Sequence, residues 1–122
     1  MARVAIVGDL LFGSNLAGTL RAAGHEVELL GDWRRAPEHA QACDVLVVDL
    51  AAGGIDPDEL LSAFRAGPQR NPVPALASYA HVDAAAKTRA LQAGFDLVVP
   101  RSRLVRDAAA LVAELTARPR LH

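Results

Sequence analysis

Five short apolar runs alternate with segments of helical character along the chain, and this alternation limits the folds open to it. Four of the runs are continuous in apolar residues, which is typical of strands buried on both faces of a parallel sheet. The clearest of them, Val45-Leu46-Val47-Val48, lies between Asp44 and Asp49. The run at 25–30 alternates instead, as an edge strand does. The predicted strands are residues 3–7, 25–30, 44–48, 73–78 and 97–99.

A helix is expected after each strand. The predicted helices are residues 12–23, 33–42, 57–66, 83–93 and a last one capped by Ser102. The third has the strongest start, because Asp56 can cap it, Pro57 suits the first helical position and Glu59 completes a capping box. The second is weak, since Pro37 inside it should shorten or kink it. This order predicts a single α/β domain over residues 1–122, with an ordered core of about 3–117 and helices on both faces of a parallel sheet.

The composition excludes several classes of protein. Hydrophobic residues make up 52% of the 122 residues, which favours a globular domain over a disordered chain. The formal net charge of -1 gives no basic field that would attract nucleic acid or an anionic membrane. The apolar runs are too short to span a bilayer, and no secretory signal is evident. We therefore expect a cytoplasmic domain that binds neither nucleic acid nor membrane.

Two carboxylates follow the first and third predicted strands. If the strand order is 2-1-3-4-5, the sheet has its ligand crevice between these two strands, at their carboxyl ends. Asp9 and Asp49 would then face one crevice. Close carboxylates repel each other unless a proton or a hard cation such as Mg²⁺ lies between them, and a carboxylate can also attack phosphorus. The plain alternative is that Asp49 caps a loop or helix and Asp9 is a turn residue.

These features resemble the receiver domain of bacterial response regulators, over residues 3 to about 117. The resemblance rests on the apolar run that ends in Asp49, on Asp9 after the first strand, and on the segment 90-ALQAGFD-96. It implies a flavodoxin-like doubly wound (βα)5 sheet of order 2-1-3-4-5. It also implies that Asp49 is a phospho-acceptor in a two-component phosphorelay, and that Asp9, Asp49 and the carbonyl of Ala51 hold Mg²⁺.

The implied site departs from the family pattern at the acid that precedes Asp9 and at the hydroxyl residue that ends the fourth strand. Gly8 stands where the family has a second acid, so one carboxylate of the metal site is missing. The family also has a hydroxyl residue at the end of its fourth strand. Ser78 suits this role, but counting back from Gly94 puts Ala77 there unless one residue is inserted.

The third departure is the lysine that the family carries at the end of its fifth strand. The only lysine of this chain, Lys87, lies on the preceding predicted helix. An ungapped count puts Arg101 at the lysine position, whereas matching on the following proline puts Val99 there. Arginine offers charge to a phosphoryl group with a different geometry. These departures are typical of a degenerate pseudo-receiver, whose Mg²⁺ binding would be weak or absent.

Three functions remain open on the sequence. The first is a stand-alone, degenerate receiver-like domain that is not an enzyme. It would contact a histidine kinase, a downstream effector or a second copy through its last helix-strand-helix face, where Arg101, Arg103 and Arg106 form a basic patch. The second is a phospho-accepting receiver, with Asp49 modified and Ser78 or Arg101 contacting the phosphoryl oxygens. The third is a flavin or nucleotide binder, supported only by the glycine spacing of 8-GDLLFG-13.

Overall fold

The computed structural model describes residues 1–40, 42–66 and 72–118. They form one five-stranded parallel sheet in the order β2-β1-β3-β4-β5, as the sequence predicts. The strands are β1 (Arg3–Val7), β2 (Glu26–Leu30), β3 (Val45–Asp49), β4 (Ala75–Tyr79) and β5 (Leu97–Pro100). The α-helices are α1 (Leu10–Ala22), α2 (Pro57–Arg65), α3 (Ala84–Ala93) and α4 (Arg101–Ala117), and two short 3-10 helices are η1 (Trp33–His39) and η2 (Leu50–Ala52).

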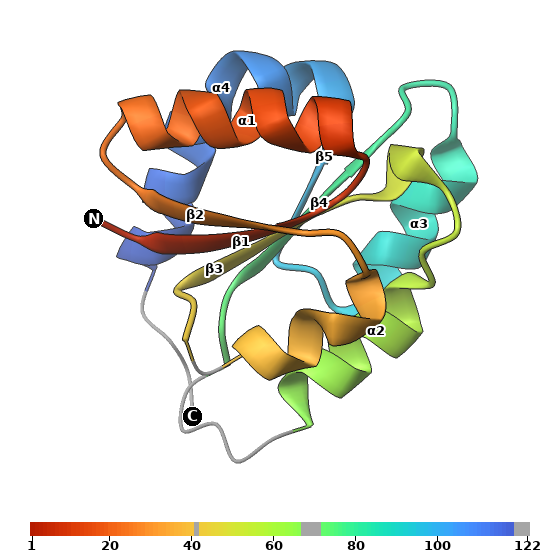
Figure 1. Cartoon of the computed structure of the whole chain (residues 1–122). Coiled ribbons are helices and arrows are strands. Elements are labelled where there is room, and N and C mark those ends of the chain that lie inside the picture. The colour runs from red at the N-terminus through yellow and green to blue at the C-terminus, as the bar shows by residue number, and fades with distance from the viewer. Residues whose placement is uncertain (41, 67–71, 119–122) are drawn as a thin grey trace.

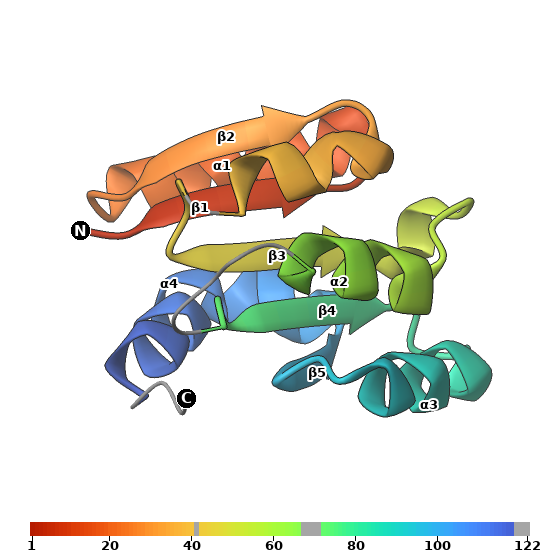
Figure 2. The same cartoon turned by 90° about the horizontal axis from the view of Figure 1, so that it is seen from below.

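The helices cover both faces of the sheet (Figure 1). In Figure 2 the five strands run side by side, with α2 and α3 in front of them and α1 and α4 behind. Alternate residues of each central strand therefore enter different cores. Val48 of β3 packs in the core with Phe64 of α2, while its neighbour Val47 packs in the core with Leu20 of α1 and Leu104 of α4. This double burial explains why the run 45–48 is apolar without alternation.

The edge strand β2 has the alternating exposure that its sequence predicts: it pairs with β1 alone, and Glu26 and Glu28 are exposed while Val27 and Leu29 are half-buried. Its outer edge is partly covered by Arg21 of α1, whose Nη2 donates a hydrogen bond of 2.8 Å to the carbonyl of Val27. A charged side chain on an edge carbonyl discourages pairing with another strand.

Two helix predictions need correction. Of the predicted helix 33–42, only residues 33–39 form a helix, the 3-10 helix η1, since Pro37 removes a backbone donor and η1 itself buries only Ala36. The last helix is not capped by Ser102. It begins at Arg101, directly after Pro100, and no side chain caps it, so Ser102 lies inside the helix. By contrast, Asp56 caps α2 as expected, accepting hydrogen bonds from the amides of Asp58 and Glu59.

The other predicted boundaries shift by at most two residues at the ends of the elements. Within the described residues, no helix is both long enough and apolar enough to cross a membrane. The predicted ordered core ends at about 117, and residues 119–122 beyond it lie outside the described residues.

Candidate functional site

Four polar side chains come together at the carboxyl ends of the central strands. Asp9 follows β1 and caps α1, Asp49 ends β3, and Ser78 lies in β4 directly opposite Asp49 in the strand register. Arg101 is the first residue of α4, immediately after β5. Parallel strands bring these positions to the same edge of the sheet, although Asp9 and Arg101 are 92 residues apart in the chain. These residues thus lie at the sheet edge where the strand order reverses, which is the place predicted for a ligand crevice.

Asp49 is buried, and both of its carboxylate oxygens accept hydrogen bonds from within the chain. Its side chain is only 1% exposed. Its Oδ1 accepts hydrogen bonds from Ser78 Oγ at 3.0 Å and from the amide of Ala51 at 3.2 Å. Its Oδ2 accepts one from Arg101 Nη2 at 2.6 Å. The carboxylate is therefore the cap of η2, as the plain alternative expects, and it is also the centre of a polar network at the sheet edge.

Arg101 bridges the two carboxylates. A single nitrogen, Nη2, lies 2.6 Å from Oδ2 of Asp9 and 2.6 Å from Oδ2 of Asp49. The guanidinium also stacks on the ring of Phe12, with 3.9 Å between the guanidinium carbon and the ring centroid. Such a contact with an aromatic face stabilises a cation and fixes its plane. Arg101 is 35% exposed and Asp49 only 1%, so the guanidinium lies between the buried carboxylate and the solvent.

Asp9 is held by the start of α1 as well as by Arg101. Its Oδ1 accepts a hydrogen bond of 2.8 Å from the amide of Phe12, in the first turn of the helix. This bond, together with the contact to Arg101, holds the pKa of the Asp9 carboxyl below its ordinary value of 3.8. Asp9 is consequently ionised at neutral pH, and the two carboxylates face a single guanidinium charge.

The arrangement does not fit a bound divalent cation while Arg101 is in place. The guanidinium nitrogen already lies between the two carboxylates that would be ligands. Gly8 supplies no third carboxylate, and a Cβ added there would lie 3.1 Å from Cβ of Asp49, so an acid at this position needs a small shift of the backbone. Within the described residues, no group of three or more acidic, histidine or cysteine side chains could hold a metal ion. Of the predicted metal ligands, Asp9 and Asp49 are brought together by Arg101, and Ala51 contacts Asp49 through its amide.

The structure decides between the alternatives that residue counting left open. Ser78, rather than Ala77, contacts Asp49, while Ala77 is buried in the core on the α2 side. Arg101, rather than Val99, reaches the carboxylates, and Val99 is buried in the core on the α4 side. Phe12 belongs to the site and was not predicted, because one aromatic residue in an otherwise apolar helix start carries no distinguishing signal.

The glycine spacing that suggested a phosphate loop has a packing explanation. Gly13 lies within α1, and a Cβ added to it would come 2.4 Å from Cδ1 of Leu29 in β2. The second glycine therefore allows α1 to approach β2 closely. Only Gly8 lies in the loop before the helix, so the segment does not form the glycine-rich cradle that a nucleotide phosphate needs.

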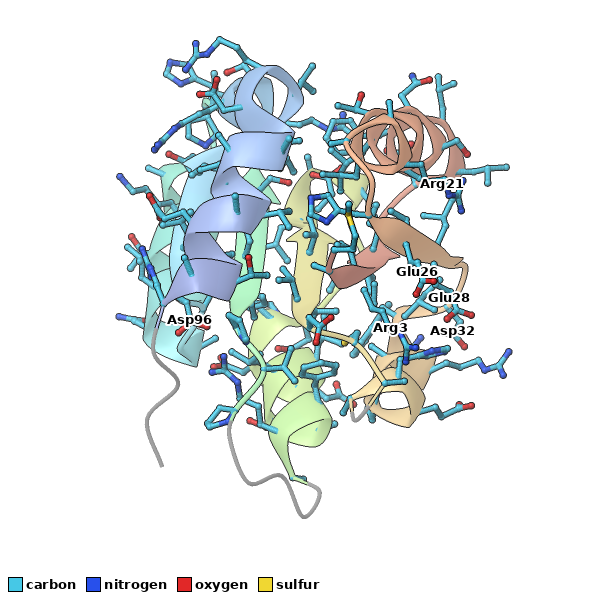
Figure 3. The ribbon with its side chains drawn as sticks, turned by 90° about the vertical axis from the view of Figure 1, so that its left-hand side faces the viewer. Arg3, Arg21, Glu26, Glu28, Asp32 and Asp96 are labelled. Carbon is cyan, nitrogen blue, oxygen red and sulfur yellow. The ribbon has the colours of Figure 1, made fainter. Side chains whose placement is uncertain are left out.

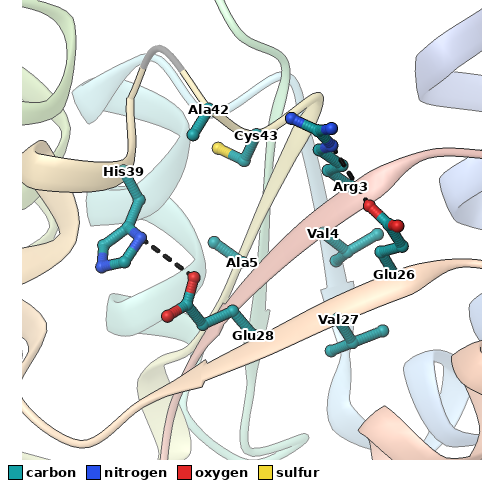
Figure 4. A pocket seen from close by; sticks show the side chains of 9 residues that line it. All are labelled: Arg3, Val4, Ala5, Glu26, Val27, Glu28, His39, Ala42 and Cys43. Atoms are coloured by element: carbon teal, nitrogen blue, oxygen red, sulfur yellow. Dashed lines mark hydrogen bonds and ion pairs between the residues drawn. The ribbon is translucent and has the colours of Figure 1, made fainter.

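A separate hollow lies near the amino ends of β1 and β2. Figure 3 shows Arg3, Glu26 and Glu28 on this side of the molecule. The hollow has a volume of about 450 Å³. Figure 4 shows two polar contacts at it, the ion pair of Arg3 with Glu26 at 3.1 Å and the contact of His39 Nδ1 with Glu28 Oε2 at 3.1 Å. This hollow lies at the opposite ends of these strands from Asp9. It therefore contributes no group to the aspartate site, the name used below for Asp9, Asp49, Ser78 and Arg101.

No protein-family model matches the sequence, and no curated protein matches it either. Solved structures do match the fold. A protein assigned as a response regulator from Chloroflexus aurantiacus has a TM-score of 0.82 at 26% identity, covering 96% of this chain and 98% of that one. A chemotaxis protein of Vibrio cholerae has a TM-score of 0.79 at 23% identity, covering 94% and 98%.

A third similar structure shares the fold. It is the receiver domain of a sensor histidine kinase from Pseudomonas aeruginosa, with a magnesium ion coordinated in its active-site cleft. Its TM-score is 0.79 at 20% identity, with 96% of this chain and 98% of that one covered. The five parallel strands and the helices around them are thus arranged as in these proteins, and the chain has the fold of response-regulator receiver domains.

Proposed function

We propose that the chain is a degenerate receiver domain of the two-component type, which acts in the bacterial cytoplasm through protein–protein contact and is not an enzyme. One observation carries the proposal: both oxygens of Asp49 are engaged within the chain, by Arg101 on one side and by Ser78 and Ala51 on the other. Hydrogen bonds to both oxygens, one of them from a cation, draw electron density from the carboxylate and make it a poorer nucleophile toward a phosphodonor. The fold then serves as a rigid platform for a partner.

The surface proposed for the partner is the first part of α4 with β5 and α3. Arg103 and Arg106 are 48% and 70% exposed and both approach Asp107, where the backbone of α4 departs from helical geometry. Arg101, which the sequence grouped with them, points into the aspartate site instead. The basic patch available to a histidine kinase, an effector or a second copy therefore consists of Arg103 and Arg106.

The test of this surface is a charge reversal. We expect Arg103→Glu/Arg106→Glu to weaken partner binding at least about tenfold, since like charges across an interface cost several kcal/mol. A pull-down with the candidate kinase or effector, and sedimentation of the chain alone for self-association, would measure this. Arg34→Glu, on η1, is the matched control. Partner binding unchanged by the double reversal would count against this face.

The second candidate is a phospho-accepting receiver, and the contact between Ser78 and Asp49 favours it. An oxygen of Asp49 would form the new bond to phosphorus while the donor's leaving group departs with its electron pair. Ser78 Oγ and the guanidinium of Arg101 are placed to contact the phosphoryl oxygens. This reaction first requires Oδ2 of Asp49 to lose its hydrogen bond from Arg101. A magnesium ion, present in the similar receiver domain, would neutralise the phosphoryl charge if the site could admit it.

Intact-mass spectrometry separates the two candidates. After incubation with acetyl phosphate and Mg²⁺, we expect no phosphoryl adduct on the wild type, because Asp49 is occupied by donors from its own chain. Asp49→Asn is run beside it as the control. A single adduct on the wild type that is missing from Asp49→Asn would contradict the degenerate interpretation and establish Asp49 as a phospho-acceptor.

A further inference from the structure

We infer that the guanidinium of Arg101 is an internal substitute for a divalent cation, so that the ion and the arginine exclude each other from one position between Asp9 and Asp49. The inference concerns the site itself and holds whether or not the chain signals through the surface of α4. It predicts a protein whose aspartate site is indifferent to divalent cations, and in which removal of one side chain uncovers a cation site.

The distances place one nitrogen where an ion would lie. Since Nη2 of Arg101 is 2.6 Å from each carboxylate oxygen, the two oxygens are at most 5.2 Å apart, twice that distance. Oxygen ligands lie about 2.3–2.6 Å from Ca²⁺ and about 2.0–2.1 Å from Mg²⁺. A calcium ion could therefore take the place of Nη2 with almost no movement of either carboxylate, whereas magnesium requires each oxygen to move inward by about 0.5 Å.

The charges oppose joint occupancy. Asp9 and Asp49 supply two negative charges, and Gly8 supplies none. With Arg101 in place, its positive charge already balances one of these two negative charges. A divalent ion that entered beside Arg101 would be repelled by the guanidinium at contact distance. Without Arg101, two close carboxylates remain uncompensated, which is the condition that favours a hard cation with oxygen ligands.

Arg101 is fixed in this position by more than its two ion pairs. Its guanidinium stacks on Phe12, and Leu104, one turn further along α4, is completely buried in the core. Pro100 joins β5 to the helix with its φ at −60°, which limits the directions from which the first residue of α4 can leave the sheet. These contacts hold the arginine over the carboxylates, so the ion must displace a side chain that is already oriented.

The experiment compares cation binding by the wild type, Arg101→Met, Arg101→Met/Asp9→Asn and Arg103→Met. Methionine keeps much of the unbranched stem of arginine without its charge. Arg103→Met is the matched control, because Arg103 lies on the same helix and pairs with Asp107 rather than with the site. Calcium chloride and magnesium chloride are titrated separately at constant ionic strength, with isothermal calorimetry and thermal unfolding as the two readouts.

We expect saturable binding and a raised Tm only for Arg101→Met, at least tenfold tighter than any binding by the wild type, and with calcium preferred over magnesium. The Asp9→Asn change in the double variant should abolish it. Equal Asp9-dependent binding by wild type and Arg101→Met would overturn the inference, as would absence of binding by Arg101→Met. If Arg101→Met does not fold, Arg101→Gln replaces it. Folding restored by calcium supports the inference, and failure of both variants to fold at saturating calcium overturns it.

This outcome is separable from that of the proposed function. Cation binding is measured on the isolated chain and does not involve Arg103 or Arg106, whereas partner binding is tested by changing those two residues. If the wild type binds neither calcium nor any partner, the inference about Arg101 stands and the proposed function fails. If the wild type binds calcium and also binds a partner through α4, the proposed function stands and the inference fails.

Discussion

Replacing Arg101 by methionine is expected to lower the free energy of unfolding by about 3 kcal/mol in the absence of divalent cations, because breaking a buried ion pair leaves an uncompensated charge. Asp49 bears this loss, since its side chain is 1% exposed and water cannot readily replace the guanidinium. Urea denaturation at neutral pH measures the change. The expected loss of unfolding free energy is at the lower end of the range for buried ion pairs because Arg101 itself is partly exposed.

A double-mutant cycle identifies the cause. In Arg101→Met/Asp49→Asn the buried charge is gone, so the second substitution should recover a large part of the stability that the first one removes. Arg103→Met should change the stability by no more than about 0.5 kcal/mol, because its partner Asp107 is near the surface and the contact is 3.8 Å long. Additive effects of Arg101→Met and Asp49→Asn would show that the loss comes from packing on Phe12 and not from the buried charge.

The central strands could be predicted from the sequence because each is buried on both faces. Such a strand needs a continuous apolar run, and a run of four β-branched or leucine residues between two acids has few other structural uses. The strand order and the receiver-like fold follow from the alternation of five strands and helices together with the family resemblance, and the sheet confirms both. The conformation of residues 33–39 is harder to predict from the sequence, since their apolar pattern is weak and Pro37 interrupts it. Packing of this segment against β1, β2 and α2 determines its backbone instead.

The aspartate site could be predicted to the level of the sheet edge and no further. The apolar run fixes where Asp49 ends its strand, and the topology brings Asp9 beside it. The choices between Ser78 and Ala77, and between Arg101 and Val99, depend on register differences of one or two residues. Neighbouring residues in a strand point to opposite faces, so an error of one in the count exchanges a site residue for a core residue. Backbone pairing of β4 with β3 and the start of α4 after Pro100 settle these positions.

Leu104 links this site to the core, and Leu104→Ala is expected to lower the free energy of unfolding by about 3 kcal/mol, the usual effect of emptying a leucine site in a packed core. Leu104 is fully buried with Ile6, Val47 and Val99, three residues beyond Arg101 in the same helix. The loss should also loosen the start of α4, so that Arg101 holds Asp49 less firmly. Thermal and urea unfolding measure the first effect, and hydrogen exchange of the Ala51 and Phe12 amides, which donate to the two carboxylates, measures the second.

Val105→Ala is the control for this prediction, since Val105 is the next residue of α4 but is 60% exposed. Its removal should change the stability by no more than about 0.5 kcal/mol and leave both amides protected. If Leu104→Ala destabilises the chain while exchange of the two amides rises only in proportion to global unfolding, the core and the aspartate site are held independently. If exchange of these amides rises more than that, the packing of the Leu104 side chain also determines how firmly Arg101 holds Asp49. A partner that binds the first turns of α4 would then change the contact between Arg101 and Asp49 directly.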